Sequence, residues 1–312
     1  MNLKRLELTL TTKCNSQCIH CQADASPLRN DVMEVKDAYD YLTEATAVSN
    51  IESFMIFGGE PMLYSKRAIA LIKKAHQLQI PKIEMITNGV WGKNKAIAEK
   101  LAKKLKVAGL NSASISVDVF HLQYIPLEYP RNAALALLEA GIEDVSWNVA
   151  VIESINATNE FDKKTKQILE TLQPIGLDYG EVKIVPVGRA TQNLRRYFQP
   201  TPLYGSCEGD PVIENTLTNP GVVCIEPSGS VHICWDLIIG NAKNKPLSQI
   251  ITEYDWRRNQ IIRTLVEEGP TGLPRLLRAR SHRFEEDQYV NKCHLCMEIR
   301  KTLKLYHLNA YS

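Results

Sequence analysis

The sequence of 312 residues lacks the features of a membrane, secreted or nucleic-acid-binding protein. It has no apolar run near the roughly 18 residues that a membrane-spanning helix needs. Its first residues, MNLKRLELTLTTK, are interrupted by charge and contain no apolar core of a signal peptide. The formal net charge is only +2, so bulk electrostatics gives no reason to expect a nucleic acid or a membrane as partner. We therefore expect a cytoplasmic protein.

The motifs of common nucleotide-binding folds are also missing. No G-x-G-x-x-G follows the first strand-like stretch, and no G-x-x-x-x-G-K-[ST] phosphate loop occurs anywhere in the chain. There is no internal repeat and no low-complexity segment. These absences are consistent with a globular protein, and its cysteines are the residues that indicate its chemistry.

Cysteine is absent from residues 22 to 206, and the eight cysteines fall into two groups on either side of that gap. The first group is Cys14, Cys18 and Cys21, and the second begins at Cys207 and ends at Cys296. Thiols are kept reduced in the cytosol, where clustered cysteines more often bind metal than form disulfides. The gap suggests two separate metal centres, the second in a domain of its own.

The first two thirds of the chain alternate strand-like and helix-like stretches. This alternation predicts a parallel sheet with crossover helices. In such a fold the catalytic and binding residues lie at the carboxyl ends of the strands. The strand-like stretches are residues 3–11, 51–57, 82–87, 112–118, 144–152 and 181–187. The helix-like stretches between them are residues 33–48, 65–80, 93–109, 130–141 and 160–172.

After Ala190 the alternation stops. A turn-rich segment is followed by a β-hairpin with its turn at Pro227 to Gly229, a long helical stretch from Leu247 to Glu268, and a CxxC that opens a terminal helix. Because the length is near the upper limit for one domain, we expect two: residues 1–192 and residues 193–312. The fold class is α/β, a partial (β/α)6 parallel barrel with a small C-terminal domain made of a β-hairpin plus helices.

The first cysteine group has the spacing CxxxCxxC. Three thiolates can hold three irons of a [4Fe–4S] cluster and leave the fourth iron open, whereas such clusters are normally held by four cysteines. This spacing resembles the signature of the radical S-adenosylmethionine (radical SAM) superfamily, in which the open iron chelates SAM. A structural zinc site, with His20 as the fourth ligand, is the alternative.

The resemblance extends beyond the cysteine loop, over roughly residues 3 to 190. It covers FGGEP (Phe57 to Pro61), TNG (Thr87 to Gly89), the serine of SISVD, the asparagine of WNVAV and the arginine of PVGRA. It implies that cluster-bound SAM is contacted by His20, Gly58, Gly59, Glu60, Thr87, Asn88, Ser116, Asn148 and Arg189. His20 departs from the pattern, because an aromatic residue usually precedes the last cysteine. Asp118 and His121, in VDVFH, could touch substrate or simply order a loop.

The second cysteine group resembles the C-terminal extension called twitch in its short form and SPASM in its longer one. Gly229, Cys234 and the Gly240–Asn241 pair match that pattern. The resemblance implies an auxiliary [4Fe–4S] cluster, and therefore a small C-terminal iron–sulfur domain, with the ligands Cys207, Cys234, Cys293 and Cys296. Zinc bound to the same four residues is an alternative, and Cys207 and Cys234 could also be inert buried thiols.

Cys224 is the cysteine left over. With a three-residue turn it pairs with His232 across the hairpin and shares a sheet face with Cys234. It could replace Cys207 as a ligand, be an ordinary strand residue, or be a catalytic thiol that returns a hydrogen atom to a substrate radical.

The resemblance implies an enzyme that cleaves SAM reductively and abstracts hydrogen from its substrate. The cofactors are two [4Fe–4S] clusters and SAM, and the implied electron donor is a flavodoxin or a ferredoxin. The substrate is expected to be a ribosomally made peptide, as for peptide epimerases, although Trp235 stands where that branch carries a cysteine. A small molecule such as an aminocyclitol or a sugar is one alternative, and a zinc-stabilised binding protein is another. The oligomeric state is open.

Overall fold

Nine strands form one curved sheet in this computed structural model, which describes residues 1–210, 215–277 and 286–305. The strand order is β11-β10-β9-β1-β2-β3-β4-β5-β6, and β1 to β6 pair in parallel in chain order. The six parallel strands are β1 (Arg5–Thr11), β2 (Ser53–Gly58), β3 (Lys82–Thr87), β4 (Ser112–Ser116), β5 (Asp144–Val151) and β6 (Tyr179–Lys183).

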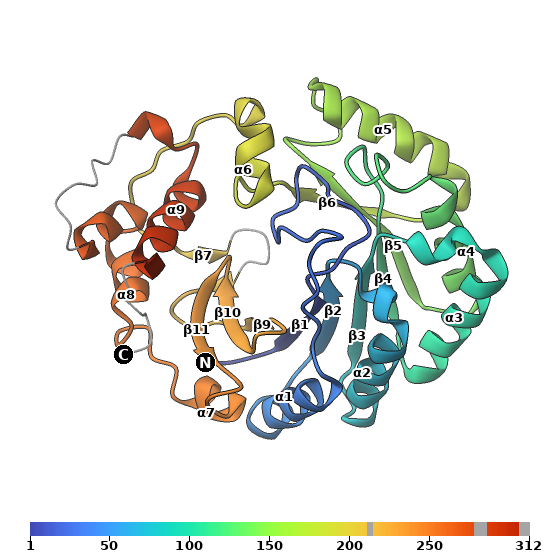
Figure 1. Ribbon diagram of the computed structural model, residues 1–312, viewed down its shortest axis with the longest axis horizontal. Coiled ribbons are helices and arrows are strands. Elements are labelled where there is room, and N and C mark those ends of the chain that lie inside the picture. Colours follow the sequence, from blue (N-terminus) through green and yellow to red (C-terminus); the bar gives the residue numbers. More distant parts are fainter. Residues whose placement is uncertain (211–214, 278–285, 306–312) are drawn as a thin grey trace.

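Helices cover the convex side of this sheet and form the crossovers between its strands (Figure 1). They are α1 (Val35–Val48), α2 (Ser65–Gln77), α3 (Lys95–Ala108), α4 (Glu128–Glu139) and α5 (Glu160–Leu172). Local chemistry sets their ends. At α3, for example, the Asn94 side chain accepts from the Ile97 N–H, and Gly109 ends the helix with φ 108°. The expected partial (β/α)6 parallel barrel is confirmed.

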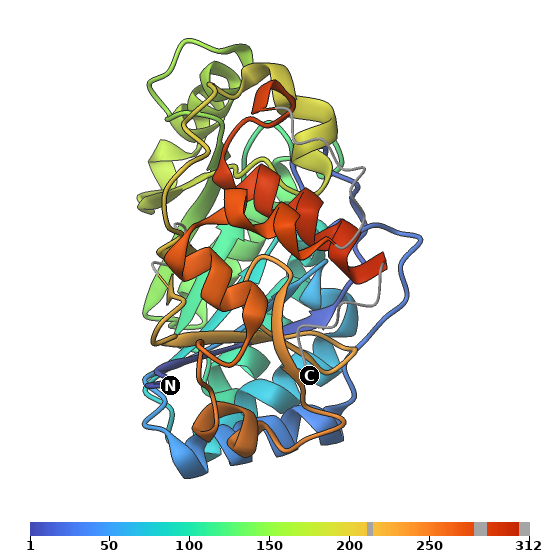
Figure 2. The same ribbon diagram turned by 90° about the vertical axis from the view of Figure 1, so that its left-hand side faces the viewer.

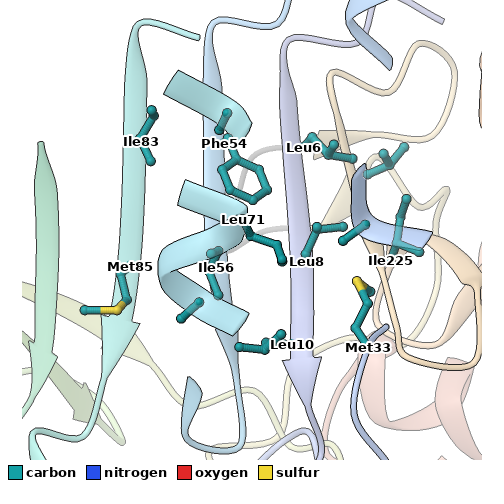
Figure 3. Close-up of a cluster of buried hydrophobic side chains, with 14 of the residues drawn as sticks. Leu6, Leu8, Leu10, Met33, Phe54, Ile56, Leu71, Ile83, Met85 and Ile225 are labelled. Atoms are coloured by element: carbon teal, nitrogen blue, oxygen red, sulfur yellow. The ribbon is translucent and has the colours of Figure 1, made fainter. Parts of the chain in front are cut away.

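The main core lies between the sheet and these helices. Alternate side chains of β1, namely Leu6, Leu8 and Leu10, are fully buried there, beside Phe54 and Ile56 of β2 (Figure 3). Because successive strand residues point to opposite faces, the residues between these leucines point to the concave face, the lumen of the partial barrel. That lumen face of β1 carries polar side chains.

The C-terminal hairpin continues the barrel sheet. Strand β9 (Val222–Ile225) pairs in parallel with β1, and β10 (Ser230–Cys234) and β11 (Leu237–Asn241) follow it in antiparallel fashion. The predicted pairing of Cys224 with His232 is confirmed. Because Val223 and Ile225 share the hydrophobic core with β1, main-chain pairing and common packing join this region to the barrel. A domain boundary near residue 192 stays a prediction.

The remaining elements are short except for the last helix. They are α6 (Arg189–Leu194), β7 (Gly209–Asp210), β8 (Asn215–Thr216), α7 (Leu247–Thr252), α8 (Gln260–Glu267) and α9 (Lys292–Leu305). The predicted helix from Leu247 to Glu268 is wrong as one element. Asn259 caps a new helix by accepting from the Ile262 N–H, and the Tyr254 hydroxyl donates to the Leu217 carbonyl in the break.

Figure 2 shows the orange and red segments, which include α8 and α9, in front of the strands when the molecule is turned by 90°. The amino terminus lies beside α7, where the Met1 amino group donates to the Ile251 carbonyl at 3.1 Å. In the part of the chain that the structure describes, no helix has the length and apolar character needed to cross a membrane.

Candidate active site

The first three cysteines lie in the loop that leaves the carboxyl end of β1. The loop is tied to its own returning segment: Cys14 N–H donates to the Ser26 carbonyl at 3.1 Å, and Thr11 Oγ1 donates to the Asp31 carbonyl at 2.6 Å. Cys14 and Cys18 are buried, and Cys21 is half-buried. All three line one cavity at the mouth of the barrel.

The electrostatics of these thiols fits a site built for a cation. Burial, together with Glu60 and Cys21, raises the pKa of Cys14 to about 11. Burial, Asp118 and the other two cysteines also raise the pKa of Cys18. Thiolates are therefore costly here unless a metal offsets their charge, since coordination deprotonates a thiol outright. The donor set fits an iron–sulfur cluster.

The sulfur spacing is wider than a single metal ion requires. Four thiolates around zinc, at about 2.3 Å each, bring their sulfurs within roughly 3.8 Å of one another. Among the described residues, no three cysteine sulfurs lie within 4.8 Å of each other, and His20 does not join such a group with cysteines.

The GGEP turn after β2 holds the cysteine loop by close backbone contact. A Cβ on Gly59 would lie 2.1 Å from the Lys13 carbonyl oxygen, and Gly58 has φ 143° with Thr11 O at 2.4 Å from its Cβ position. Gly59 N–H donates to Thr11 O, and Glu60 N–H donates to Lys13 O, at 2.7 and 2.9 Å. Only glycines permit this approach.

Glu60 lies behind the cavity and organises its wall. Its carboxylate accepts from Met62 N–H at 2.9 Å, from Thr87 Oγ1 at 2.7 Å and from Asn88 N–H at 2.7 Å. Burial raises its pKa to about 7, although these hydrogen bonds act in the opposite direction. Thr87 and Asn88 therefore support Glu60, and the Asn88 amide also approaches Cys14 Sγ at 3.7 Å.

Most of the residues proposed from the sequence line the cavity, but two do not. Those that line it with the three cysteines are His20, Gly58, Gly59, Thr87, Asn88, Ser116 and Arg189. Glu60 and Asn148 are outside the lining and act through neighbours, since Glu60 holds Thr87, and Asn148 donates to Ser116 Oγ at 3.5 Å. Asn148 also lies within β5 and not at its end.

Arg189 ties the cysteine loop to the segment after β6. Its guanidinium donates to the Cys18 carbonyl at 3.0 Å, to Asp24 Oδ1 at 2.9 Å and to the Ala25 carbonyl at 2.7 Å. The preceding Gly188, at φ 58°, would place a Cβ 2.5 Å from the Gln22 carbonyl oxygen. Sequence reasoning assigned Arg189 to SAM but missed this scaffolding role.

A histidine pair closes the other side of the cavity. The His20 ring packs against the Phe120 ring, with the centroids 4.7 Å apart and the planes tilted by 40°, and it meets His121 edge-on with the centroids 4.9 Å apart. Burial and His121 lower the pKa of His20 to about 3. Asp118 accepts from His121 Nδ1 at 2.8 Å and from the Phe120 and Ala150 N–H groups, so it orders this loop while His121 faces the cavity.

Cys224 lies on the lumen wall below the cavity. Its Sγ is 3.6 Å from Thr9 Oγ1, and its strand partner on β1 is Glu7. Burial and the Glu7 carboxylate raise the pKa of Cys224, which keeps it a thiol. Thr9 lies two residues before Thr11, the strand partner of Gly58, so the Cys224 thiol is level with a point about 7 Å before the cavity end of β1, at roughly 3.3 Å per residue.

The second cysteine group gathers between the hairpin and α9. Cys293 and Cys296 lie in the first turns of α9, Cys234 ends β10, and Cys207 N–H donates to the Leu265 carbonyl at 2.8 Å. Burial and the Cys296 thiol raise the pKa of Cys207. Cys293 packs with Val185 and Val187, which follow β6. A thiolate at Cys207 is therefore costly unless a cation offsets its charge.

The family follows from the sequence match. The model of the radical SAM superfamily matches residues 8–188, which include the second half of β1, the cysteine loop, the GGEP turn and the whole of β2 to β6. The chain belongs to the radical SAM superfamily. The resemblance inferred from CxxxCxxC is thereby confirmed.

Curated relatives are similar over the same part. A "Probable GTP 3',8-cyclase" of Methanocaldococcus jannaschii is 29% identical over 203 residues, 63% of this chain and 63% of the relative. The "Putative peptide biosynthesis protein YydG" of Bacillus subtilis is 24% identical over 198 residues, 62% of this chain and 58% of the relative. The chain thus spans less than two thirds of the length of these relatives.

Solved radical SAM structures share the fold over nearly the whole chain. BtrN in complex with AdoMet and 2-DOIA has a TM-score of 0.50 at 14% identity, with 93% of this chain and 100% of BtrN covered. Native anSMEcpe with bound AdoMet has a TM-score of 0.51 at 12% identity, with 98% and 97% covered. At these identities the likeness establishes the fold alone.

Proposed function

We propose that the protein is a radical SAM enzyme that modifies a ribosomally made peptide. One observation carries the SAM chemistry of this proposal: the two buried thiols Cys14 and Cys18 and the half-buried Cys21 line a single cavity together with the glycine turn Gly58–Gly59. Cys14, Cys18 and Cys21 hold the first [4Fe–4S] cluster, and the polar side chains among the residues that line the cavity position SAM. When bound, the cluster supplies the electron that cleaves SAM, and the resulting 5′-deoxyadenosyl radical takes a hydrogen atom from the substrate.

The chain's own residues prepare this site for SAM. Backbone groups of Gly58 and Gly59 and the side chains of Ser116 and Asn88 face the cavity and offer the hydrogen bonds that a polar nucleoside and amino acid need. Glu60 fixes Thr87 and Asn88, and Asn148 fixes Ser116. His20, neutral because its pKa is low, offers a flat face beside Phe120.

The second metal centre is an auxiliary [4Fe–4S] cluster held by Cys207, Cys234, Cys293 and Cys296. The proximity of Cys207 and Cys296 supports this assignment, as does Arg300, which donates both to Cys296 Sγ and to the carbonyl of Trp235 next to Cys234. A flavodoxin or a ferredoxin is the electron donor that we propose, because clusters of this kind work at low potential. Nucleic acid and membrane are not among the proposed partners.

Cys224 is the residue that we assign to the return of a hydrogen atom. A substrate carbon radical takes the hydrogen of the thiol, so that a C–H bond forms, the S–H bond breaks and a thiyl radical remains on Cys224. The lumen-facing, protonated thiol near Thr9 supports this role, because a thiolate has no hydrogen atom to give. One electron from the reductant and one proton restore the thiol.

A peptide substrate is supported by the similarity to YydG, which is described as a peptide biosynthesis protein. The second candidate is a nucleotide or other small molecule, because the relatives also include GTP 3',8-cyclases. The lumen face carries hydroxyl and charged groups, with Ser114 and Ser146 in mutual contact at 3.2 Å and Arg5 bonded to Glu84 at 2.6 Å. A polar substrate fits such a wall.

The first experiment tests the cluster and SAM chemistry without any substrate. After anaerobic reconstitution we expect about eight irons per chain and, with SAM and dithionite, 5′-deoxyadenosine. A Cys18→Ser variant should lose about four irons and all 5′-deoxyadenosine formation. A zinc-loaded protein without iron, or iron-loaded protein that never cleaves SAM, would contradict the proposal.

The second experiment tests the substrate and Cys224. A short peptide encoded beside the gene is incubated in D2O with SAM and reductant, with GTP in a parallel reaction. We expect deuterium at a peptide α-carbon, because the Cys224 thiol exchanges with solvent before it donates. Cys224→Ser should still form 5′-deoxyadenosine but give no deuterated product. Turnover of GTP and not of the peptide would favour the second candidate.

A further inference from the structure

Arg300 is a charged side chain buried among the second group of cysteines. Only 5% of it is exposed, and it lies on α9 four residues after Cys296. Residues four apart share one face of a helix, so the guanidinium lies over the CxxC segment. Arginine is seldom this deeply buried without an anionic partner.

The contacts of the guanidinium are directed at sulfur. Nε donates to Cys296 Sγ at 3.2 Å, and a terminal nitrogen donates to Met297 Sδ at 3.2 Å and to the Trp235 carbonyl. Trp235 directly follows Cys234. Arg300 therefore connects the helix that carries two of the four cysteines to the hairpin that carries a third.

The groups around Arg300 are mainly the proposed ligands. Cys296 Sγ accepts from Nε, and Cys234 directly precedes Trp235, whose carbonyl oxygen also accepts from the guanidinium. A neutral thiol is a poor partner for a buried cation, and a thiolate is a good one. The buried arginine thus matches an anionic cluster–thiolate unit better than a set of free thiols.

A fixed positive charge and an N–H···S hydrogen bond both act on the electron affinity of an iron–sulfur cluster. Reduction adds one negative charge, which a nearby cation stabilises, and hydrogen bonds to the sulfurs raise the potential in the same direction. The effect is large in a buried site, because little solvent screens it. Arg300 combines both contributions at Cys296.

We propose that Arg300 is a positioning residue that raises the reduction potential of the auxiliary [4Fe–4S] cluster through its charge and its hydrogen bond to the Cys296 thiolate. The proposal rests on the auxiliary cluster of the proposed function. It assigns to this arginine the task of keeping the cluster ready to accept an electron. Its place beside the cluster is set by its helical spacing from Cys296.

The test uses the full chain with the first cluster removed by Cys14→Ala, Cys18→Ala and Cys21→Ala, so that only the auxiliary cluster responds. This parent should bind about four irons after anaerobic reconstitution. Arg300→Gln, Arg300→Lys and the control Arg263→Gln are made in it. Arg263 is an exposed arginine of α8, so the control removes the same charge from the surface.

The readout is a redox titration followed by electron paramagnetic resonance, which reports only the loaded fraction and tolerates incomplete loading. Arg300→Gln should lower the equilibrium constant for reduction at least tenfold, which is about 59 mV for a one-electron couple. The equilibrium constant for Arg300→Lys should lie between those of the parent and Arg300→Gln, because lysine keeps the positive charge but lacks the planar guanidinium that donates several hydrogen bonds at once. Arg263→Gln should have the same equilibrium constant for reduction as the parent.

Two results would overturn the proposal in different ways. If Arg300→Gln and Arg263→Gln agree within twofold in the equilibrium constant, Arg300 does not tune the cluster, and the auxiliary cluster itself stands. If the parent binds no iron, the auxiliary cluster is wrong and the proposal falls with it. A merely structural arginine changes loading but leaves the potential of the loaded fraction unchanged.

Discussion

Gly59→Ala is the substitution that should most directly separate the packing of the cysteine loop from its chemistry. A Cβ at residue 59 would lie 2.1 Å from the Lys13 carbonyl oxygen, 2.5 Å from its carbon and 3.0 Å from the Cys14 nitrogen. Real Cβ atoms essentially never come closer than 3.0 Å, so the Lys13 carbonyl must move by about 0.9 Å. All these neighbours are backbone, and none can rotate away.

The displacement has an energetic and a chemical consequence. Overpacking of this kind costs about 1–3 kcal/mol, and it also weakens the 2.9 Å hydrogen bond from Glu60 N–H to Lys13 O. At roughly 2 °C per kcal/mol for a chain of this size, the unfolding midpoint should fall by several degrees. A shift of about 0.9 Å beside Cys14 also exceeds the roughly 0.5 Å that a preorganised site tolerates.

The assay is thermal unfolding of the apo-protein, followed by anaerobic reconstitution and iron counting. Gly180→Ala is the matched control, because nothing lies within 4 Å of the Cβ position at that exposed strand residue. We expect Gly59→Ala to bind fewer irons at the first site, whereas Gly180→Ala behaves as the wild type. If both variants unfold and load alike, the close approach of the GGEP turn does not set the position of the cysteine loop.

Three further predictions concern the sheet and the wall of the cavity. The pKa of Glu60 is about 7, above its ordinary 4.5, so between these pH values the folded apo-protein binds more protons than the unfolded chain and becomes more stable as the pH falls from 7 to 4.5. At about 1.4 kcal/mol per pKa unit, the gain in the free energy of unfolding is at most roughly 3 kcal/mol. Glu60→Gln should remove this pH dependence in urea titrations. Ile225→Ala should cost about 2–4 kcal/mol in one cooperative unfolding transition, because Ile225 is fully buried in the core that β9 shares with β1; a separate second transition would contradict this. Asn215→Asp should lower the free energy of unfolding by roughly 2–4 kcal/mol, because a carboxylate oxygen replaces the amide nitrogen that donates to the Val222 and Ile233 carbonyls at 2.8 Å. An unchanged midpoint of urea unfolding would refute this prediction.

The parallel barrel could be predicted because its signals are local. Apolar residues at period two in β1 and at helical spacing in α1 to α5 identified each element, and chain order then determined the order of parallel strands. The glycines and polar residues that follow the strands predicted that the site lies at the carboxyl edge of the sheet. The cysteine loop and Gly58–Gly59 are at that edge, as their positions after β1 and β2 indicated.

Features that depend on contacts between distant segments could not be predicted. The break between α7 and α8 depends on the Asn259 cap and on the Tyr254 contact with Leu217, and neither interrupts the apolar periodicity. Arg189 and Glu60 carry the expected residue types, but their hydrogen bonds go to the protein backbone and to Thr87. The signal for Arg300 was available as an arginine one helical turn after Cys296, yet helical spacing alone does not show which face is buried.

The pairing of β9 with β1 is what brings the two halves of the proposed chemistry together. Since Leu6 and Leu8 pair with Val223 and Ile225 on the core side, the intervening Cys224 must face the lumen beside Glu7 and Thr9. A slip of one residue would turn the thiol into the core and place Val223 on the lumen. The buried leucines of β1 therefore determine which C-terminal side chain faces the lumen, and the same sheet continues through β10 to Cys234.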